Sequence, residues 1–153
     1  IMSSDWSSDV CSSDLDTLHH VYRSPDGQPV FLFADQFDTA LILENFFSNA
    51  VRACERKGAF PFVEVSAFLN DTLPRMAEIT IRDKGVGFTT EELILLRRGK
   101  GFTSKGSASP DHGIGLVHCR FLIEQHGGRF DISSKKGDGT DITFTLPAHA
   151  ADE

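Results

Sequence analysis

The chain has 153 residues, 40% of them hydrophobic and 24% charged, which is typical of one soluble globular domain with its own core. Its formal net charge of -7 argues against a general nucleic-acid-binding protein, which needs a basic surface. The three cysteines, Cys11, Cys54 and Cys119, lie far apart. They predict neither a disulfide framework nor a zinc site, and favour a reduced, cytoplasmic setting. No apolar run reaches the roughly 18 residues of a membrane span.

Residues 1–15 differ in composition from the rest of the chain. They contain Ser-Ser-Asp three times, with no helical or strand period and little to bury. The segment is similar to a translated sequencing adapter, and the alternative is a flexible Ser/Asp linker. We therefore expect a non-native or disordered segment over residues 1–15 and one domain over residues 16–150, with the natural protein continuing upstream.

The first half of the domain is predicted to hold two strands and a long helix. Residues 19–23 and 30–33 are expected strands, and the Pro-Gly turn at 24–27 between them favours a hairpin. From Asp35 the period is helical, and Gly58 with Pro61 ends it. The predicted apolar side of this helix consists of Ala40, Leu43, Phe47, Ala50 and Cys54. The opposite, polar side consists of Asn45, Asn49, Arg52 and Arg56.

The second half alternates strands and shorter helices. Strands are expected over 62–68 and 77–82, a short helix from Thr89 onward, and a second helix over 115–126. Residues 129–133 and 140–146 are expected to pair as a hairpin. Residues 99–113, rich in Gly, Ser and Lys, are predicted to be irregular. Three helices and a mostly antiparallel sheet predict an α+β fold, a two-layer sandwich.

The long helix carries the first chemical signal. Asn45, Asn49 and Arg52 recur at i, i+4 and i+7, so they share one face. An amide oxygen is a hard, neutral ligand suited to Mg²⁺, and a guanidinium one turn further on pairs with phosphate oxygens. The alternative reading of this pattern is an ordinary solvated helix face.

Two glycine-rich segments carry the second signal. Asp83 opens a DxGxG sequence directly after a strand, where a carboxylate can accept a hydrogen bond from an exocyclic amine such as that of adenine. Gly113 and Gly115 begin the second helix, where backbone N–H groups form a ready anion site. Taken singly, each segment is equally compatible with a simple turn or a helix cap.

The order and spacing of these segments carry more information than any one of them. The asparagine helix, the DxGxG turn, Gly-Phe-Thr-Ser-Lys (101–105), the GxGL helix start and Gly-Asp-Gly-Thr (137–140) form a joint pattern. On these motifs the chain resembles the catalytic, ATP-binding domain of sensor histidine kinases, within the gyrase/Hsp90/histidine kinase/MutL ATPase group. The resemblance covers residues 30–147 and implies a Bergerat-type ATP-binding fold.

The resemblance implies a role for each matching residue. Asn45 and Asn49 would be the catalytic pair, with Asn49 as the Mg²⁺ ligand. Asp83 would read the adenine amine, and Thr140 would support Asp83 through water. The other implied nucleotide-binding residues are Arg52 and Lys105 at the phosphates, Gly85 and Gly87 along the adenine pocket, Phe102 as the marker of a flexible lid, and Gly113, Gly115 and Leu116 at the second helix.

Asn45 also indicates the subclass. Gyrase-like and Hsp90-like ATPases resemble one another in carrying a glutamate four residues before the metal-binding asparagine, as the base that activates water. Here that position is Asn45, which favours transfer to a protein acceptor over ATP hydrolysis. Lys84 departs from the small polar residue usual in the family, a change that the pocket should tolerate.

The implied activity is one half of a kinase reaction. The domain would bind Mg²⁺–ATP and donate the γ-phosphoryl group to a histidine on a separate dimerisation and phosphoacceptor domain, and through it to a response regulator. His19 and His20 lack the surroundings of an acceptor histidine, and membrane contact would come only from upstream segments. The alternatives are a serine kinase of the anti-sigma-factor type, a degenerate ATP sensor without transfer, and, least favoured, a pure interaction module.

Overall fold

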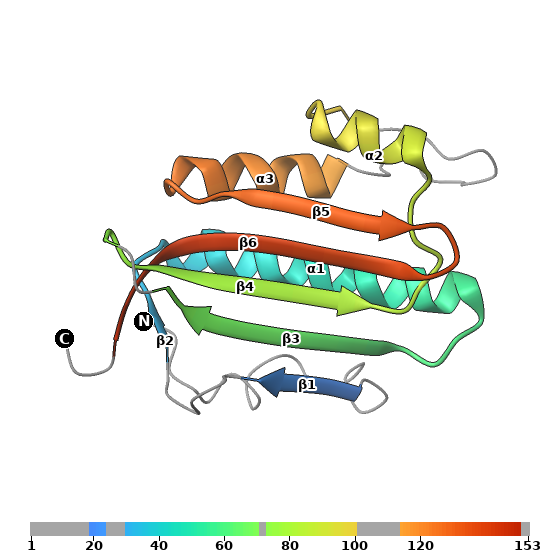
Figure 1. The fold of residues 1–153 in the computed structure, drawn as a ribbon, viewed down its shortest axis with the longest axis horizontal. Coiled ribbons are helices and arrows are strands. Elements are labelled where there is room, and N and C mark those ends of the chain that lie inside the picture. Colours follow the sequence, from blue (N-terminus) through green and yellow to red (C-terminus); the bar gives the residue numbers. More distant parts are fainter. Residues whose placement is uncertain (1–18, 24–29, 71–72, 101–113, 151–153) are drawn as a thin grey trace.

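The computed structural model describes residues 19–23, 30–70, 73–100 and 114–150. Within these ranges the elements in chain order are β1 His19–Arg23, β2 Val30–Leu32, α1 Gln36–Lys57, β3 Phe62–Leu69, β4 Met76–Asp83, α2 Thr90–Arg97, α3 Ile114–Gln125, β5 Phe130–Lys135 and β6 Gly139–Ala150. Figure 1 shows a curved sheet with α1 running behind it and α3 beside α1. The expected two-layer α+β sandwich is confirmed.

The described strands form a six-stranded sheet in the order β1-β3-β4-β6-β2, with β5 also paired to β6. The pairs β3–β4, β4–β6, β5–β6 and β2–β6 are antiparallel, and β1–β3 is parallel. The strands expected over 62–68 and 77–82 are therefore confirmed, as is the hairpin of β5 and β6. Strand β6 is 12 residues long and has β4, β5 and β2 as partners, so it organises the sheet.

The hairpin expected between residues 19–23 and 30–33 is wrong. Strand β1 pairs with β3, whereas β2 pairs with the last residues of β6, from Ala148 to Ala150. The two strands thus lie at opposite ends of the sheet order. The reason is that β6 extends beyond its last partner on β4, and β3 presents a further edge. The unpaired N–H and C=O groups of these two edges favour pairing with β1 and β2, and this preference outweighs that of the local turn for a hairpin.

The ends of α1 follow from its sequence. Asp35 caps the N-terminus, where its Oδ1 accepts hydrogen bonds from the N–H groups of Phe37 at 2.9 Å and Asp38 at 3.0 Å. Gly58 ends the helix with φ 70°, and its N–H is directed to the carbonyls of Cys54 and Glu55. Both predicted ends are confirmed.

The buried face of α1 is wider than the predicted apolar stripe. Ala40 is exposed and Phe47 only half-buried, whereas the buried residues are Thr39, Ile42, Leu43, Phe46, Ala50, Ala53 and Cys54. The prediction is confirmed for Leu43, Ala50 and Cys54 and wrong for Ala40, and the face is wider because α1 packs against two partners, the sheet and α3. As a result Asn45 and Asn49 border the buried face instead of lying opposite it.

The two shorter helices are anchored at their ends. Thr89 and Glu92 form a reciprocal capping box at the start of α2, as the Thr-Thr-Glu-Glu sequence predicts. Helix α3 lies antiparallel to α1: its Cys119 is near the Ile42 carbonyl, and His126, just past its C-terminus, contacts Asp38 in the first turn of α1 at 3.1 Å.

The core lies between the sheet and these helices. Phe46 of α1 is fully buried, and its ring centroid is 5.3 Å from that of Phe144 on β6 and 6.0 Å from that of Phe130 on β5. Ile81, Ile132 and Ile142, from three adjacent strands, extend the same layer. Helix α1 is therefore fixed on the inner face of the sheet by the bulkiest side chains of the core.

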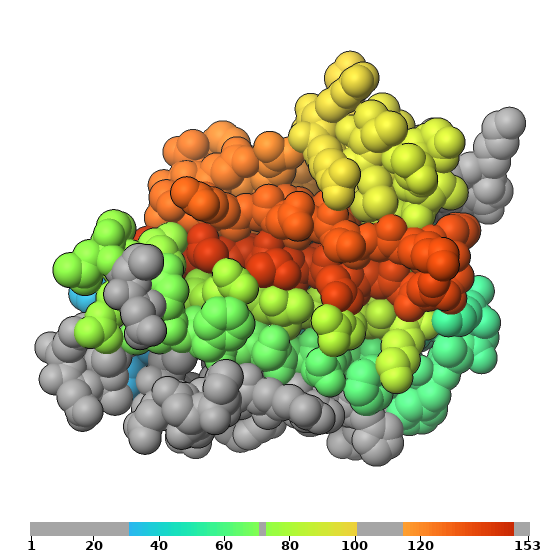
Figure 2. Space-filling model, in the orientation of Figure 1, coloured from blue at the N-terminus to red at the C-terminus, as the bar shows by residue number. Residues whose placement is uncertain are grey.

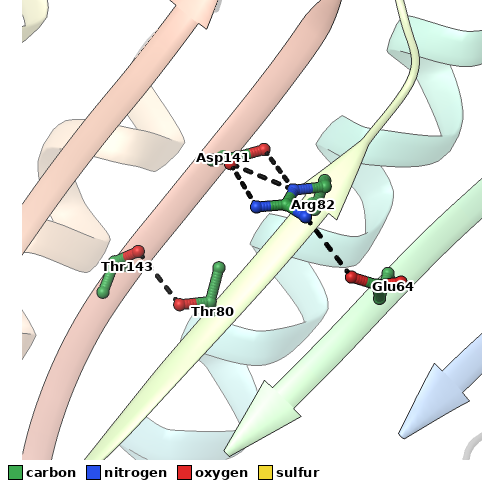
Figure 3. Close-up of polar contacts among 5 residues, drawn as sticks. All are labelled: Glu64, Thr80, Arg82, Asp141 and Thr143. Carbon is green, nitrogen blue, oxygen red and sulfur yellow. Dashed lines mark hydrogen bonds and ion pairs between the residues drawn. The ribbon is translucent and has the colours of Figure 1, made fainter. Parts of the chain in front are cut away.

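No described helix covers the outer face of β4, β5 and β6, which is turned to the viewer in Figure 2. The side chains here are polar and paired across strands. Arg82 binds Asp141 through two nitrogens, at 2.9 and 2.8 Å, and reaches Glu64 at 3.5 Å, while Thr80 and Thr143 share a hydrogen bond of 3.0 Å (Figure 3). This alternation of apolar inner and polar outer residues is that of a half-solvated antiparallel sheet.

Candidate nucleotide-binding site

Three polar side chains lie side by side at one end of the inner face of the sheet, next to its apolar residues. Ile81, Ile142 and Ile132 are register partners on β4, β6 and β5. Two residues further along each strand, on the same face, the partners are Asp83, Thr140 and Ser134. We call these last three residues the polar row; it adjoins the turn between β5 and β6.

Asp83 is a buried acid at the end of β4, with 7% of its surface exposed. Its Oδ1 accepts a hydrogen bond from the Gly85 N–H at 2.8 Å. Burial raises the pKa of Asp83 to about 6, and hydrogen bonds from the backbone N–H groups of Gly85 and Thr140 limit the rise. A carboxylate in this setting is a strong acceptor with limited access to water.

Ser134 connects the polar row to the loop after β4. Its Oγ accepts a hydrogen bond from the Phe88 N–H at 2.8 Å and donates one to the Gly139 carbonyl at 2.7 Å. The same oxygen is 3.0 Å from the hydroxyl of Thr140. One side chain on β5 therefore holds both the DxGxG loop and the β5–β6 turn.

The glycines of the two loops allow them to pack against each other. A Cβ on Gly87, which has φ 64°, would collide with the Lys135 carbonyl, and a Cβ on Gly139 with the Asp83 carbonyl. The Gly137 N–H also donates to the Val86 carbonyl at 2.7 Å. The structure thus shows close packing of backbone on backbone at Gly87 and Gly139; the resemblance implies a pocket-shaping role for Gly87 and no separate role for Gly139.

Helix α1 contacts two glycine segments, the DxGxG loop and the start of α3. A Cβ on Gly85 would lie 2.5 Å from the backbone of Ala53, and the Val86 N–H donates to the Ala53 carbonyl at 3.0 Å. At the other end, a Cβ on Gly115 of α3 would lie 2.7 Å from Oδ1 of Asn45. Asn45 and Ala53 are eight residues apart, about 12 Å along the helix.

Asn49 lies midway between these two contacts, one turn from each. We call Asn45, Asn49 and Ala53 the α1 ridge. The structure therefore brings together the asparagine helix, the DxGxG loop and the start of α3, as the joint motif predicts. Asn49 is half-buried, and its side chain makes no hydrogen bond to another residue that the structure describes.

The remaining predicted residues fall into three groups. Arg52 is exposed on α1, beyond Asn49. Leu116 is 4% exposed and belongs to the hydrophobic core, and its predicted contact with a nucleotide remains a prediction. Phe102, Lys105 and Gly113 lie outside the described residues, and their roles remain predictions.

The donor atoms present are of the kind that Mg²⁺ takes with a nucleotide. The described residues contain no group of three His, Cys, Asp or Glu side chains that could hold a metal by themselves. The half-buried amide of Asn49 offers one hard oxygen, and Mg²⁺ commonly combines one or two protein oxygens with phosphates and water. Such a donor set fits a metal that arrives with a phosphate ligand.

A shallow depression of about 270 Å³ lies elsewhere, between the end of α2 and α3. Its lining includes Arg97, Arg98, Val117, Arg120, Phe121 and Glu124. It contains none of the predicted site residues. The candidate site therefore consists of the polar row and the α1 ridge, and does not include this depression.

Two residues of this arrangement were missed in the sequence. Ser134 gave no motif signal, but it could have been found by counting alternate residues along the β5–β6 hairpin from Ile132 and Thr140. Ala53 reads as a plain core residue, and nothing in its own sequence context marks the contact with Gly85.

Comparison with known proteins shows the family. Residues 34–150 match the family described as "Histidine kinase-, DNA gyrase B-, and HSP90-like ATPase". The chain belongs to this family of ATPases, as the resemblance predicts. No helix among the described residues is both long enough and apolar enough to cross a membrane.

Relatives of the chain include proteins that are named as kinases. The chain is 34% identical over 119 residues to the adaptive-response sensory kinase SasA of Prochlorococcus marinus subsp. pastoris, covering 76% of this chain and 30% of that protein. It is 31% identical over 109 residues to the sensor histidine kinase ZraS of Klebsiella oxytoca, covering 71% and 21%. The chain thus spans less than a third of either relative.

A solved structure shares the fold. The mycobacterial sensor histidine kinase MprB superposes with a TM-score of 0.65 at 21% identity, over 88% of this chain and 86% of that one. The sandwich of Figure 1 is therefore the fold of a histidine kinase ATPase domain.

Proposed function

We propose that this chain is the catalytic domain of a sensor histidine kinase, which binds Mg²⁺–ATP and donates its γ-phosphoryl group to a histidine on a separate domain. One observation carries the proposal. The α1 ridge places Asn49 midway between the DxGxG loop, which holds the buried Asp83, and the N-terminus of α3. The groups that we propose as base acceptor, metal ligand and anion site thus follow one another along one helix.

Asp83 is proposed to recognise the base. Its carboxylate is buried, held by two backbone N–H groups and flanked by Thr140 in the polar row. An ionised carboxylate accepts the hydrogen bond of an exocyclic amine, and the low local dielectric strengthens that bond. Adenine presents such an amine.

The start of α3 is proposed to receive the phosphates. This helix has 12 residues, so the partial positive charge of its dipole is well developed at the N-terminus. Arg52 on α1 and Lys105, outside the described residues, would add positive charge. Gly113 and Gly115 would permit the phosphates to approach the backbone.

Asn49 is proposed to hold Mg²⁺ through its amide oxygen. When bound, the ion would neutralise phosphate charge and help align the γ-phosphoryl group for transfer. Asn45 is proposed to orient the site, because its Nδ2 donates to the Leu41 carbonyl at 2.9 Å and its Oδ1 faces Gly115 of α3.

The nature of residue 45 supports transfer to a protein over hydrolysis of ATP. An amide has no basic site with which to activate water, so the chain lacks a general base there. Positioning of the donor against an acceptor would then supply most of the catalysis. We propose that the partners are a phosphoacceptor histidine domain and a response regulator. Residues 16–150 would form the catalytic unit in the cytoplasm.

Calorimetric titration of the 153-residue chain with ATP, with and without Mg²⁺, tests the proposal. Asp83→Ala is expected to weaken ATP binding by about tenfold or more, because the amine loses a charged acceptor. Asn49→Ala is expected to abolish the gain in affinity that Mg²⁺ brings. Asp131→Ala, which removes an exposed aspartate on β5, is the matched control and should leave both values unchanged.

Absence of ATP binding by a folded native chain would refute the proposal. So would equal binding by the native chain and Asp83→Ala, because the base would then not be read at the polar row.

A further inference from the structure

We infer that Ser134 is a positioning residue that makes the base-binding end of the site selective for an amino group over a carbonyl group. The inference rests on the proposed function, in which Asp83 reads the base. It concerns the neighbouring hydroxyl of Thr140, whose hydrogen-bond direction Ser134 determines.

The chemistry of the partners fixes the direction of each hydrogen bond around Ser134. The Gly139 carbonyl can only accept, so the single hydroxyl proton of Ser134 is donated to it, over 2.7 Å. The Phe88 N–H can only donate, so it occupies one lone pair of Ser134 Oγ. The contact with Thr140 Oγ1 at 3.0 Å must then be donated by Thr140.

Thr140 is therefore left with acceptor capacity alone. Its only proton is directed to Ser134, and Thr140 is 4% exposed, so little water is available to compete for it. Its register partner on β4, the ionised Asp83, is likewise an acceptor. Two adjacent acceptors favour a ligand, or a bridging water, that brings donors. They disfavour a 6-oxo purine, which would place a carbonyl oxygen against them.

The arrangement also explains why Ser134 and not its neighbour takes this role. Ser133 precedes it on β5 and is exposed on the outer face, opposite Asp141. Only the inner position lies in the polar row, between the Phe88 N–H and the β5–β6 turn. Removing the Ser134 hydroxyl would free the Thr140 proton to rotate toward the ligand and donate to a carbonyl.

The test compares the affinities of the 153-residue chain for ATP and inosine triphosphate (ITP), which carries a carbonyl in place of the amine. Ser134→Ala is expected to reduce the ATP-over-ITP preference about three- to tenfold, through weaker ATP binding, stronger ITP binding or both. Ser134→Thr keeps the hydroxyl and should restore the preference. Ser133→Ala, the same change on the opposite face, should not alter it.

The ratio of the two affinities separates positioning from simple destabilisation. A purely structural Ser134 would lower the melting temperature and weaken both nucleotides equally, and that result would overturn the inference. If Ser134→Ala does not fold, Ser134→Cys, which retains the shape with a much weaker donor, is expected to show the reduced ratio, and an unchanged ratio in it would equally overturn the inference. Failure of the proposed function is distinct, since the native chain would then bind no ATP or Asp83→Ala would bind it normally.

Discussion

At the scale of single residues, Asp83 occupies a position that the pattern of its strand assigns to an apolar side chain. Ala77, Ile79 and Ile81 precede it on the inner face of β4, and all are buried. Two backbone hydrogen bonds to the Asp83 carboxylate offset only part of the cost of removing it from water. Its raised pKa shows that the ionised form of this side chain destabilises the folded chain. A costly buried acceptor beside two glycine loops is typical of ligand sites and supports the proposed role of Asp83.

Replacing Asp83 should change how stability depends on pH. Its pKa rises from 3.8 to about 6 on folding, so the folded chain holds this proton more tightly than the unfolded chain. The free energy of unfolding therefore decreases as pH rises from about 4 to about 6, and then stays level for this group. Asp83→Asn should remove that decrease, on the order of 2–3 kcal/mol at about 1.4 kcal/mol per pKa unit.

Urea unfolding of the native chain, Asp83→Asn and the surface control Asp131→Asn between pH 4 and pH 7 measures this. If the free energy of unfolding of the native chain and of Asp83→Asn changed with pH in the same way, the pKa of the Asp83 carboxyl would not be raised by folding.

At the scale of elements, α1 is the helix that the other parts of the candidate site contact. Its two ends are capped, by Asp35 and Gly58, and its middle is locked by Phe46 against β5 and β6. The DxGxG loop contacts it at Ala53 and α3 contacts it at Asn45. A shift of either partner along α1 would therefore alter the spacing between the proposed base-binding and phosphate-binding ends.

Gly85→Ala should displace the DxGxG loop from α1. The new methyl group would lie 2.5 Å from the Ala53 backbone, which cannot yield as a flexible side chain can. We expect a stability loss of about 1–3 kcal/mol, as for overpacking in a core, and an ATP affinity at least about tenfold lower because Asp83 moves with the loop.

Gly58→Ala is the matched control, measured by the same unfolding and calorimetry experiments. It has open space around its Cβ position but φ 70°, so it should cost about 1 kcal/mol of stability and leave ATP affinity intact. Equal losses of affinity in both variants would mean that the contact with α1 does not position the loop.

At the scale of the whole molecule, the two faces of the sheet differ in what they contribute. The inner face buries a continuous apolar layer against α1 and α3, whereas the outer face carries exposed ion pairs such as Arg82 with Asp141 and Glu64 (Figure 3). Burial of apolar surface dominates folding energetics, and exposed ion pairs contribute little after screening. The stability that holds the site together therefore comes from the inner layer.

Phe46→Ala and Arg82→Ala should separate these contributions. Phe46 is fully buried among aromatic neighbours, so its truncation is expected to cost about 3–5 kcal/mol of unfolding free energy. Arg82 is half-exposed, and its loss should cost no more than about 1 kcal/mol. Chemical denaturation of both variants at neutral pH measures the difference; a larger loss for Arg82→Ala would assign a structural role to the outer face.

The sequence predicted the elements better than their pairing. Local signals determined the ends of α1, the capping box at Thr89 and the β5–β6 hairpin, because caps and tight turns depend on a few neighbouring residues. They failed for β1 and β2, since the partner of an edge strand depends on which edges the rest of the sheet leaves open. The width of the buried face of α1 failed for a similar reason: it depends on α3, which joins α1 only in the folded chain.

For the site, the sequence by itself determined which chemical groups are present: the amides of Asn45 and Asn49, the carboxylate of Asp83, and glycines at fixed intervals along the chain. Only the tertiary structure decided how they meet. Ser134 joins Asp83 and Thr140 in one row, and Ala53 and Asn45 receive the two glycine segments on either side of Asn49. The physical reason is that such contacts cross from strand to strand and from loop to helix, over separations that no local pattern of residues encodes.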